Sequence, residues 1–237
     1  AEIVTLRPFV RGNGLVARAV QRAVVRSRGL DPMGVAIVEA GHRPRSFLMA
    51  ERWLAGLADV LDALRPDDGV LGEEGASRAS ATGRTWVIDP VDGTYNFSQG
   101  SDYFCSALAL VDAGSARTPA IGAVHRPATG TTWLAADGAA TRDGVELGGL
   151  PEASLSESAL VTYLHPTFMA DDAVRETWLK AVRQAATIRM MGAGSVDLAN
   201  LASGQMGAWL QHTVPDWDWL PGKALVEAVG GRAEKVD

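Results

Sequence analysis

The 237-residue chain has little cysteine and no long apolar run. Its single cysteine, Cys105, excludes a disulfide framework and a zinc site made of several cysteines, and it favours a reducing, cytoplasmic setting. No window approaches the roughly 18 consecutive apolar residues of a membrane-spanning helix. The N-terminal region lacks a basic start followed by an apolar stretch, so we expect neither a signal peptide nor a membrane segment.

An excess of positive charge is also missing, since the formal net charge is −6. An acidic chain is a poor candidate for binding a nucleic-acid polymer. It can still bind a small anionic metabolite where metal ions supply positive charge locally. Apolar residues make up 47% of the chain and charged residues 21%, which allows a sizeable core and excludes global disorder.

Hydrophobic periodicity predicts an order of two helices, then strands, then mixed helices and strands. The predicted helices are Leu15–Val25, Ala50–Leu64, Asp171–Ala185, Ser195–Ala202 and Leu220–Val229. The predicted strands are Thr85–Ile88, Phe104–Val111, Ala120–His125, Thr131–Ala135, Ala159–Tyr163, Thr187–Met190 and Ala208–Leu210, the first four as an antiparallel meander. We place the junction of two halves at Gly144–Leu155, with an α+β half over 1–148 and an α/β half over 149–237.

Acids stand beside glycine or proline at three separate places, which are Glu73-Glu74, Asp89 with Asp92, and Asp216 with Asp218. Pro90 cannot continue a strand ladder, and Gly93 permits a tight turn, so the carboxylates of Asp89 and Asp92 can face one point. Two carboxylates held close together repel unless a cation lies between them. Oxygen ligands favour Mg²⁺, Mn²⁺ or Ca²⁺ over zinc or copper.

The glycine turn Gly93-Thr94 directly follows these acids and suits an anion. Backbone N–H groups at such a turn can hold a phosphate, and a threonine hydroxyl can orient a water. Taken alone, however, an Asp-Pro-x-Asp-Gly string is more often a surface turn, and Glu73-Glu74 a solvated loop. Spacing alone does not show that the three acidic places converge.

Three ordered motifs carry a resemblance to a known family. They are Gly72-Glu73-Glu74, the run from Trp86 to Thr94, and Trp217-Asp218 followed by Gly222 and the run from Glu227 to Gly231. Together with Arg189 and the segment from Gly192 to Gly204, they resemble the inositol monophosphatase family. The resemblance implies an α+β or α/β fold, namely a layered αβαβα sandwich of the inositol monophosphatase and fructose bisphosphatase type, often as a homodimer and inhibited by lithium.

The resemblance also implies a role for each matching residue. Metal ligands would be Glu73, Asp89, the carbonyl of Val91, Asp92 and Asp218, which would hold two or three Mg²⁺ ions, with Mn²⁺ as a possible substitute. Catalytic roles would fall to Glu73, Asp92 and Thr94, and phosphate binding to Gly93 and Thr94. Substrate contacts would be Gly192, Ala193, Gly194, Gln211 and Arg189.

The chain departs from the family pattern on the substrate side and near its N-terminus. Gln211 stands where the family usually has glutamate, and the segment Ser46–Arg52 lacks a metal-supporting aspartate, for which Glu51 is one substitute. The resulting hypothesis is Mg²⁺-dependent hydrolysis of a small sugar, polyol, amino-alcohol or nucleoside phosphate. Two alternatives stay open: a 3′-nucleotide, bisphosphate or histidinol-phosphate phosphatase of the same fold, and a degenerate binding protein without turnover.

Overall fold

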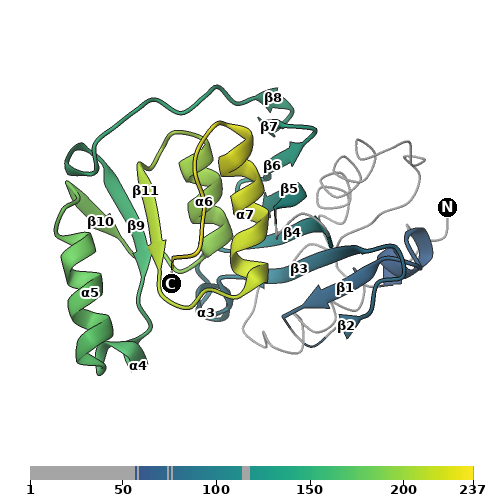
Figure 1. The fold of residues 1–237 in the computed structure, drawn as a ribbon, viewed down its shortest axis with the longest axis horizontal. Coiled ribbons are helices and arrows are strands. Elements are labelled where there is room, and N and C mark those ends of the chain that lie inside the picture. The colour runs from purple at the N-terminus through teal and green to yellow at the C-terminus, as the bar shows by residue number, and fades with distance from the viewer. Residues whose placement is uncertain (1–56, 58, 74, 76, 114–117, 237) are drawn as a thin grey trace.

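The computed structural model describes residues 57, 59–73, 75, 77–113 and 118–236, which form a layered α/β sandwich (Figure 1). Helices α6 (Gly194–Ala202) and α7 (Asp216–Ala228) lie between an eight-stranded and a three-stranded sheet. Helices α4 (Pro166–Met169) and α5 (Asp172–Val182) cover the outer side of the smaller sheet. The layered sandwich predicted from the sequence is confirmed, whereas the predicted helix Leu15–Val25, the start of the helix at Ala50, Glu51 and Glu74 lie outside the described residues.

The large sheet has the strand order β2-β1-β3-β4-β5-β6-β7-β8, and neighbours from β3 to β8 are antiparallel. Its strands are β1 (Gly69–Gly72), β2 (Ser77–Arg78), β3 (Arg84–Asp92), β4 (Cys105–Asp112), β5 (Pro119–Arg126), β6 (Thr131–Ala136), β7 (Ala139–Arg142) and β8 (Val145–Glu146). The predicted antiparallel meander is therefore confirmed. The short helix α3 (Thr94–Ser98) connects β3 to β4.

The small sheet is parallel, with the order β10-β9-β11. Its strands are β9 (Ala159–Tyr163), β10 (Thr187–Arg189) and β11 (Ala208–Gln211), and a 3-10 turn, η2 (Leu155–Glu157), precedes them. The change of sheet falls between β8 and β9. The division into halves at 148 and 149 stays a prediction.

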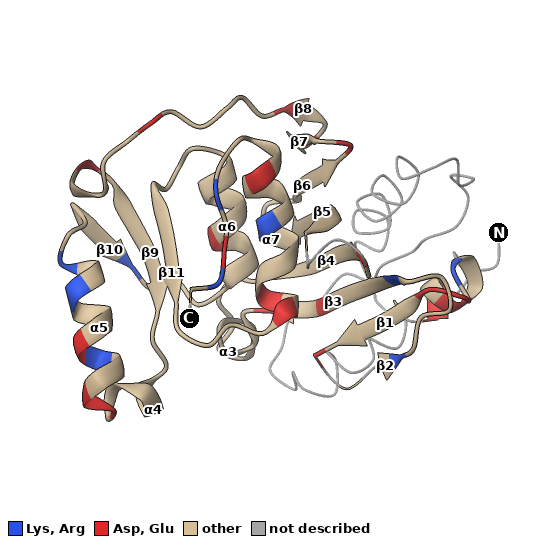
Figure 2. Cartoon of the chain, in the orientation of Figure 1, with Lys and Arg blue, Asp and Glu red and all other residues tan. Residues whose placement is uncertain are grey.

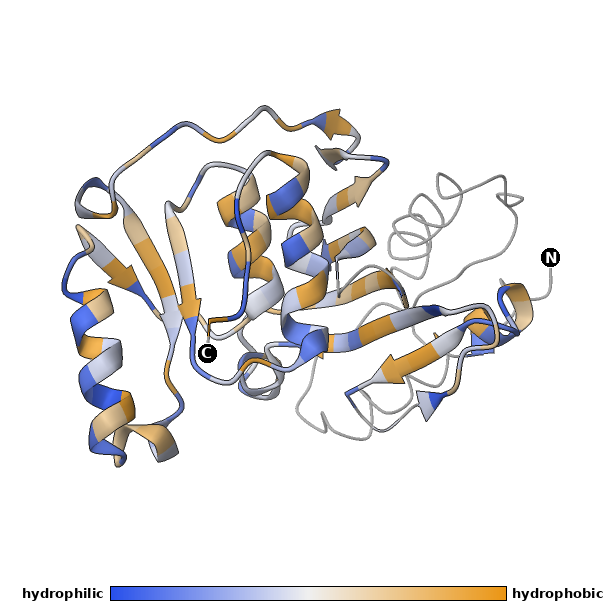
Figure 3. Ribbon diagram, in the orientation of Figure 1, coloured by the Kyte–Doolittle hydropathy of each residue, from blue (hydrophilic) through white to orange (hydrophobic). Residues whose placement is uncertain are grey.

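Side-chain alternation in β3 explains why both faces of the large sheet are covered. Trp86 and Ile88 pack in one cluster with Leu61, a residue of the helical segment that ends at residue 64. Val87, which points to the other face, packs with Leu220 of α7. Figure 3 shows the apolar residues along these strands and along α6 and α7, as expected when successive strand residues alternate between two buried faces.

The prediction that the first strand of the meander ends at Ile88 is wrong, because β3 continues to Asp92. Asp89 pairs with Ala107 and Asp92 with Cys105, so the pairing shifts by one residue and forms a bulge. Bulges are places where a strand tolerates proline, and Pro90 lies within this one. The bulge, rather than a turn after Ile88, aims both carboxylates at the site.

The last helix begins four residues before its predicted start at Leu220. A start at Leu220 would place Pro221 in the first turn, where proline is tolerated, but α7 begins at Asp216 and holds Pro221 in its interior. Asp216 and Asp218 therefore belong to the first turn of a helix and not to the end of a strand. Acidic residues are favoured there because the first N–H groups of a helix carry partial positive charge.

Gly122 of β5 allows α7 to approach the large sheet closely. A Cβ at this position would lie 2.4 Å from the Pro221 carbonyl oxygen and 2.5 Å from the Ala224 Cβ. We expect Gly122→Ala to lower the free energy of unfolding by about 1–3 kcal/mol, the usual cost of overpacking a core. Urea denaturation measures this. The matched control is Gly148→Ala, whose Cβ would meet no atom within 4 Å, and a comparable loss in that variant would contradict the packing explanation.

Candidate metal and phosphate site

Three carboxylates from distant parts of the chain meet beside the central helices. Asp89 and Asp92 come from the bulged end of β3, and Asp218 comes from the first turn of α7. One oxygen of each lies within 4.8 Å of the others. Figure 2 shows the acidic start of α7 next to the acidic end of β3. The three acidic places of the sequence thus converge, since Glu73, which follows β1, lines the same cavity and lies close enough to Asp89 for its charge to raise the pKa of that residue.

Asp89 is the most deeply buried member of this carboxylate cluster, with 1% of its surface exposed. Its Oδ1 accepts a hydrogen bond of 2.9 Å from the Val91 N–H, whereas Oδ2 is buried with no hydrogen-bond partner. Burial first, and then the charges of Asp92, Glu73 and Asp218, raise the pKa of Asp89 well above its ordinary value. A buried, unpartnered carboxylate oxygen among other carboxylates fits a cation ligand.

Asp92 joins β3 to the N-terminus of α6. Its two oxygens accept hydrogen bonds from the backbone N–H groups of Gly194, at 3.1 Å, and Ser195, at 2.5 Å. These groups have no partner within their own helix, so a carboxylate from another element satisfies them. Burial raises the pKa of Asp92 to about 6 against the lowering effect of these bonds. Burial and the charge of Asp92 raise the pKa of Asp218 to about 8.

The carboxylate cluster forms one end of a cavity of about 530 Å³. Its lining includes the remaining predicted phosphate and substrate residues, which are Gly93, Thr94, Gly192, Ala193, Gly194 and Gln211. Gly93 has a φ of 91°, and a Cβ there would lie 3.0 Å from both the Ala193 Cβ and the Tyr103 carbonyl oxygen. Glycine is therefore required at this turn.

The two atoms expected to act beside the metal, the Val91 carbonyl and the Thr94 hydroxyl, contact each other. The hydroxyl donates a hydrogen bond of 3.0 Å to the carbonyl oxygen. A carbonyl oxygen has a second lone pair, and a hydroxyl oxygen that has donated its hydrogen is left as an acceptor. Each atom therefore keeps the capacity to accept a further hydrogen bond or to bind a cation.

Arg189 does not line the cavity, although the sequence suggested that it contacts substrate. Its guanidinium donates hydrogen bonds to the Thr187 hydroxyl and to the Ile188 carbonyl at the exposed end of the small sheet. Asn96 is a contact that the sequence did not reveal. Its amide donates to the carbonyl oxygens of Met191, at 2.6 Å, and Tyr103, at 2.9 Å, and so holds the loop after β10 against α3.

Other lining residues were also missed, and some of them stand far from any motif in the sequence. His165 lines the cavity together with Tyr163, and no motif stands beside either residue in the sequence. Asp197 of α6 lines it as well and accepts a 2.6 Å hydrogen bond from the Tyr103 hydroxyl. Burial, and to a smaller degree the charge of Asp92, raise the pKa of Asp197 to about 7. Tyr95, directly after Thr94, and Asp197, within the segment from Gly192 to Gly204, did have a motif as a signal in the sequence.

A larger cavity of about 950 Å³ lies near the stacked rings of Trp209 and Trp219. Its lining contains none of the clustered carboxylates and no residue of the phosphate turn. Cys105 is buried and free, as expected for a small apolar residue, with its sulfur 3.7 Å from an Asp92 oxygen. Within the described part of the chain, no helix is long and apolar enough to cross a membrane.

Known proteins resemble this chain in sequence and in fold. A model of the inositol monophosphatase family matches residues 51–237. A histidinol-phosphatase of Mycobacterium tuberculosis is 32% identical over 178 residues, which cover 73% of this chain and 67% of that protein. The inositol-1-monophosphatase SuhB of the same organism is 31% identical over 241 residues, covering 94% of this chain and 78% of the relative.

Solved structures agree on the architecture. An inositol monophosphatase from Anabaena superposes with a TM-score of 0.73 at 21% identity, covering 98% of this chain and 84% of the other. At that identity the likeness shows the fold alone. A Thermotoga maritima inositol monophosphatase gives a TM-score of 0.66 at 26% identity, with coverage of 77% and 68%.

Proposed function

The chain belongs to the inositol monophosphatase family and is a phosphoric monoester hydrolase, and we propose that it hydrolyses a small phosphorylated metabolite in a Mg²⁺-dependent reaction. The observation that carries the metal dependence is the cluster of Asp89, Asp92 and Asp218 with its unpartnered buried oxygen. Carboxylate oxygens are the ligands that Mg²⁺ prefers, with Mn²⁺ as a substitute. We propose Glu73 and the Val91 carbonyl as further ligands; the number of ions and a homodimeric state are expectations from the family.

The charge of the cavity supports this requirement for a cation. Its lining holds several carboxylates, and no lysine or arginine lines it among the residues that the structure describes. A phosphate dianion would be repelled from such a surface. When bound, Mg²⁺ supplies the missing positive charge and lowers the pKa of a coordinated water.

The chain's own residues then bind the phosphate and orient the attacking water. We propose that the backbone N–H groups of Gly93 and Thr94 hold the phosphate oxygens at the turn after β3. Because the Thr94 hydroxyl donates its hydrogen to Val91, its oxygen can only accept, and so it can orient a water by accepting one of that water's hydrogens. Glu73, at the edge of the cavity, is the proposed acceptor of the proton that the water loses.

The alcohol part of the substrate would lie beyond the phosphate, toward Gly192, Ala193, Gly194 and Gln211. Gln211 offers a hydrogen-bond donor and an acceptor without charge. Histidinol phosphate is a second candidate substrate beside inositol phosphate, because a histidinol-phosphatase is among the most similar relatives.

Phosphate release tests the proposal. We expect release from at least one of inositol 1-phosphate, histidinol phosphate, fructose bisphosphate, adenosine 3′,5′-bisphosphate and nucleoside monophosphates, with Mg²⁺ present and not with excess EDTA. Turnover at the same rate in EDTA would contradict the role of the cluster. A folded protein that binds Mg²⁺ but releases no phosphate from the whole panel would instead favour the degenerate binding protein.

A further inference from the structure

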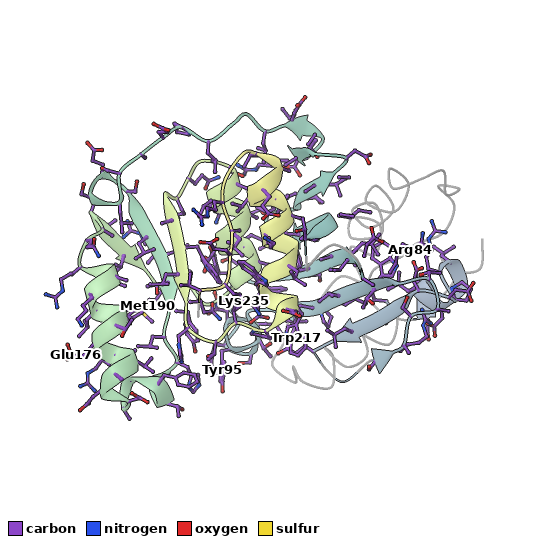
Figure 4. The ribbon with its side chains drawn as sticks, viewed as in Figure 1. Arg84, Tyr95, Glu176, Met190, Trp217 and Lys235 are labelled. Atoms are coloured by element: carbon purple, nitrogen blue, oxygen red, sulfur yellow. The ribbon has the colours of Figure 1, made fainter. Side chains whose placement is uncertain are left out.

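The mouth of the candidate site is lined by aromatic rings and thioethers beyond the carboxylate cluster. Tyr95, Tyr163 and His165 line the cavity together with Met190 and Met191. Tyr95 is 74% exposed, so most of its ring faces solvent at the opening. Figure 4 shows Tyr95 projecting from α3. A single exposed aromatic residue needs no explanation, but several gathered around one cavity mark a binding surface.

These rings come from separate parts of the fold and line the same cavity. Tyr95 is the second residue of α3, directly after the phosphate turn, whereas Tyr163 ends β9. Both residues line the cavity, Tyr95 half a turn into α3 and Tyr163 where the central strand of the small sheet ends. The lining therefore includes one tyrosine from the α3 segment and one from the small sheet.

Further rings extend from Tyr163 through a chain of edge-to-face contacts. The His165 ring lies 6.3 Å from the Tyr163 ring and 6.4 Å from the Phe168 ring, centroid to centroid. Phe168 in turn lies 4.7 Å from His212. Aromatic pairs at these separations support one another's orientation. The rings on this side of the cavity are thus held in place before any substrate arrives.

Beyond the carboxylate cluster, rings and thioethers line the cavity beside a few polar side chains, namely Asn96, Asp197 and Gln211. Gln211 stands at the end of β11 as a neutral amide, and Asp197 already accepts a bond from the Tyr103 hydroxyl. Met190 and Met191 add polarizable thioethers, which make favourable contacts with aromatic rings. A polyol has no planar face to stack on these rings and thioethers, whereas a planar ring does.

We propose that Tyr95 and Tyr163 determine specificity by stacking on a planar ring of the leaving alcohol, so that the site prefers nucleoside or imidazole-bearing phosphate monoesters over polyol phosphates. This inference rests on the proposed phosphatase function. A base or imidazole between the two tyrosines gains ring contacts on its faces, and every aromatic ring has such a face, so the preference is for planarity and not for one heterocycle.

Matched substrate pairs isolate the contribution of the ring. Adenosine 5′-monophosphate and ribose 5-phosphate differ only in the base, and histidinol phosphate and 2-aminopropyl phosphate differ in the imidazole. We expect kcat/KM to be roughly tenfold higher for the ring-bearing member of at least one pair, through KM, since stacking on an aromatic side chain typically has this size of effect. The pair that shows the larger ratio identifies whether the preferred ring is a nucleobase or an imidazole.

Variants assign the preference to the tyrosine. Tyr95→Ala should bring the ratio close to one, and Tyr95→Phe should keep it, because the phenyl face remains. Val145→Ala, at a 71% exposed position of β8 outside the cavity, is the control that should keep the ratio. Ratios near one in the wild-type protein, or an equal loss for both members of a pair in Tyr95→Ala, would overturn the assignment.

Calorimetric dissociation constants for the same pairs, in Mg²⁺, separate this inference from the function on which it rests. Tighter binding of the ring-bearing member with no hydrolysis would uphold the tyrosine assignment and contradict the phosphatase proposal. Hydrolysis of both members without any difference in KM or dissociation constant would uphold the phosphatase proposal and contradict the tyrosine assignment.

Discussion

Asp92→Asn is expected to lower phosphate release by at least about a thousandfold, because a bound metal ion contributes several kcal/mol of charge stabilisation and each 1.4 kcal/mol or so is a factor of ten. The substitution removes one charge from the cluster while keeping nearly the same volume. Steady-state phosphate release in saturating Mg²⁺ measures the effect, and circular dichroism establishes that the variant is folded.

Two further variants make this result specific. Asp218→Asn removes a different carboxylate of the cluster without disturbing the bonds from Gly194 and Ser195 to Asp92, and it should show a comparable loss. Asp102→Asn is the matched control, since Asp102 is exposed, does not line the cavity, and has its carboxylate 3.5 Å from the Arg126 guanidinium. Wild-type activity in folded Asp92→Asn would refute the assigned site.

Asp89→Asn should make the metal-free protein more stable at pH 8, although the same substitution should abolish phosphate release. The pKa values of Asp92 and Asp218 are raised to about 6 and about 8, and that of Asp89 is raised well above 3.8. A carboxyl with a raised folded-state pKa contributes stability that is fully present below its unfolded value and is lost as pH rises through the folded value. The cluster therefore destabilises the metal-free protein progressively between about pH 4 and pH 8.

An amide in place of Asp89 removes one of the repelling charges and can donate to its neighbours. Without divalent ions, we expect the variant to exceed the wild-type protein in unfolding free energy by roughly a few kcal/mol at pH 8 and by less at pH 5.5. Urea denaturation in EDTA at both pH values measures this. Other groups with shifted pKa values also change stability with pH, such as buried His125, whose pKa is lowered to about 4. Their contributions are the same in both proteins and cancel in the difference between variant and wild type.

Added Mg²⁺ should reverse the order of the two proteins. A ligand at a hundred times its dissociation constant stabilises the folded state by about 2.7 kcal/mol, and only the wild-type protein should gain this amount. If Asp89→Asn proves less stable than wild type in EDTA at pH 8, the carboxylates do not repel one another as their burial implies.

Local patterns predicted much of the fold, because each strand of the meander carries its own alternation of apolar residues. The pattern could not place the end of β3, because Pro90 argues for a turn and only the pairing of Asp92 with Cys105 on β4 keeps the strand going. The start of α7 was missed for a related reason. Pro221 is poorly suited to a helix interior, yet packing of α7 against β5 at Gly122 keeps it there.

The candidate site also has residues that the sequence could predict and residues that it could not. Asp89, Asp92 and Gly93 lie close enough in the sequence for their motif to predict a shared role. Asp218 was singled out as an acid, but only the resemblance connected it to the same site. Tyr163 and His165 reach the cavity only because β9 lies beside β11 in the small sheet, a long-range arrangement that no short segment encodes. Arg189 is the opposite case, since the resemblance suggested a substrate contact. Its guanidinium instead donates to Thr187 and Ile188, and the residue that follows it, Met190, lines the cavity.

The measurement that tests the central claim most directly is a calorimetric titration of the protein with orthophosphate, with and without Mg²⁺. The claim is that the cluster of Asp89, Asp92 and Asp218 holds a divalent cation without which the acidic cavity repels phosphate. It predicts phosphate binding in Mg²⁺ and none in EDTA, and no Mg²⁺-dependent binding in Asp89→Asn. Equal phosphate affinity in Mg²⁺ and in EDTA would contradict it.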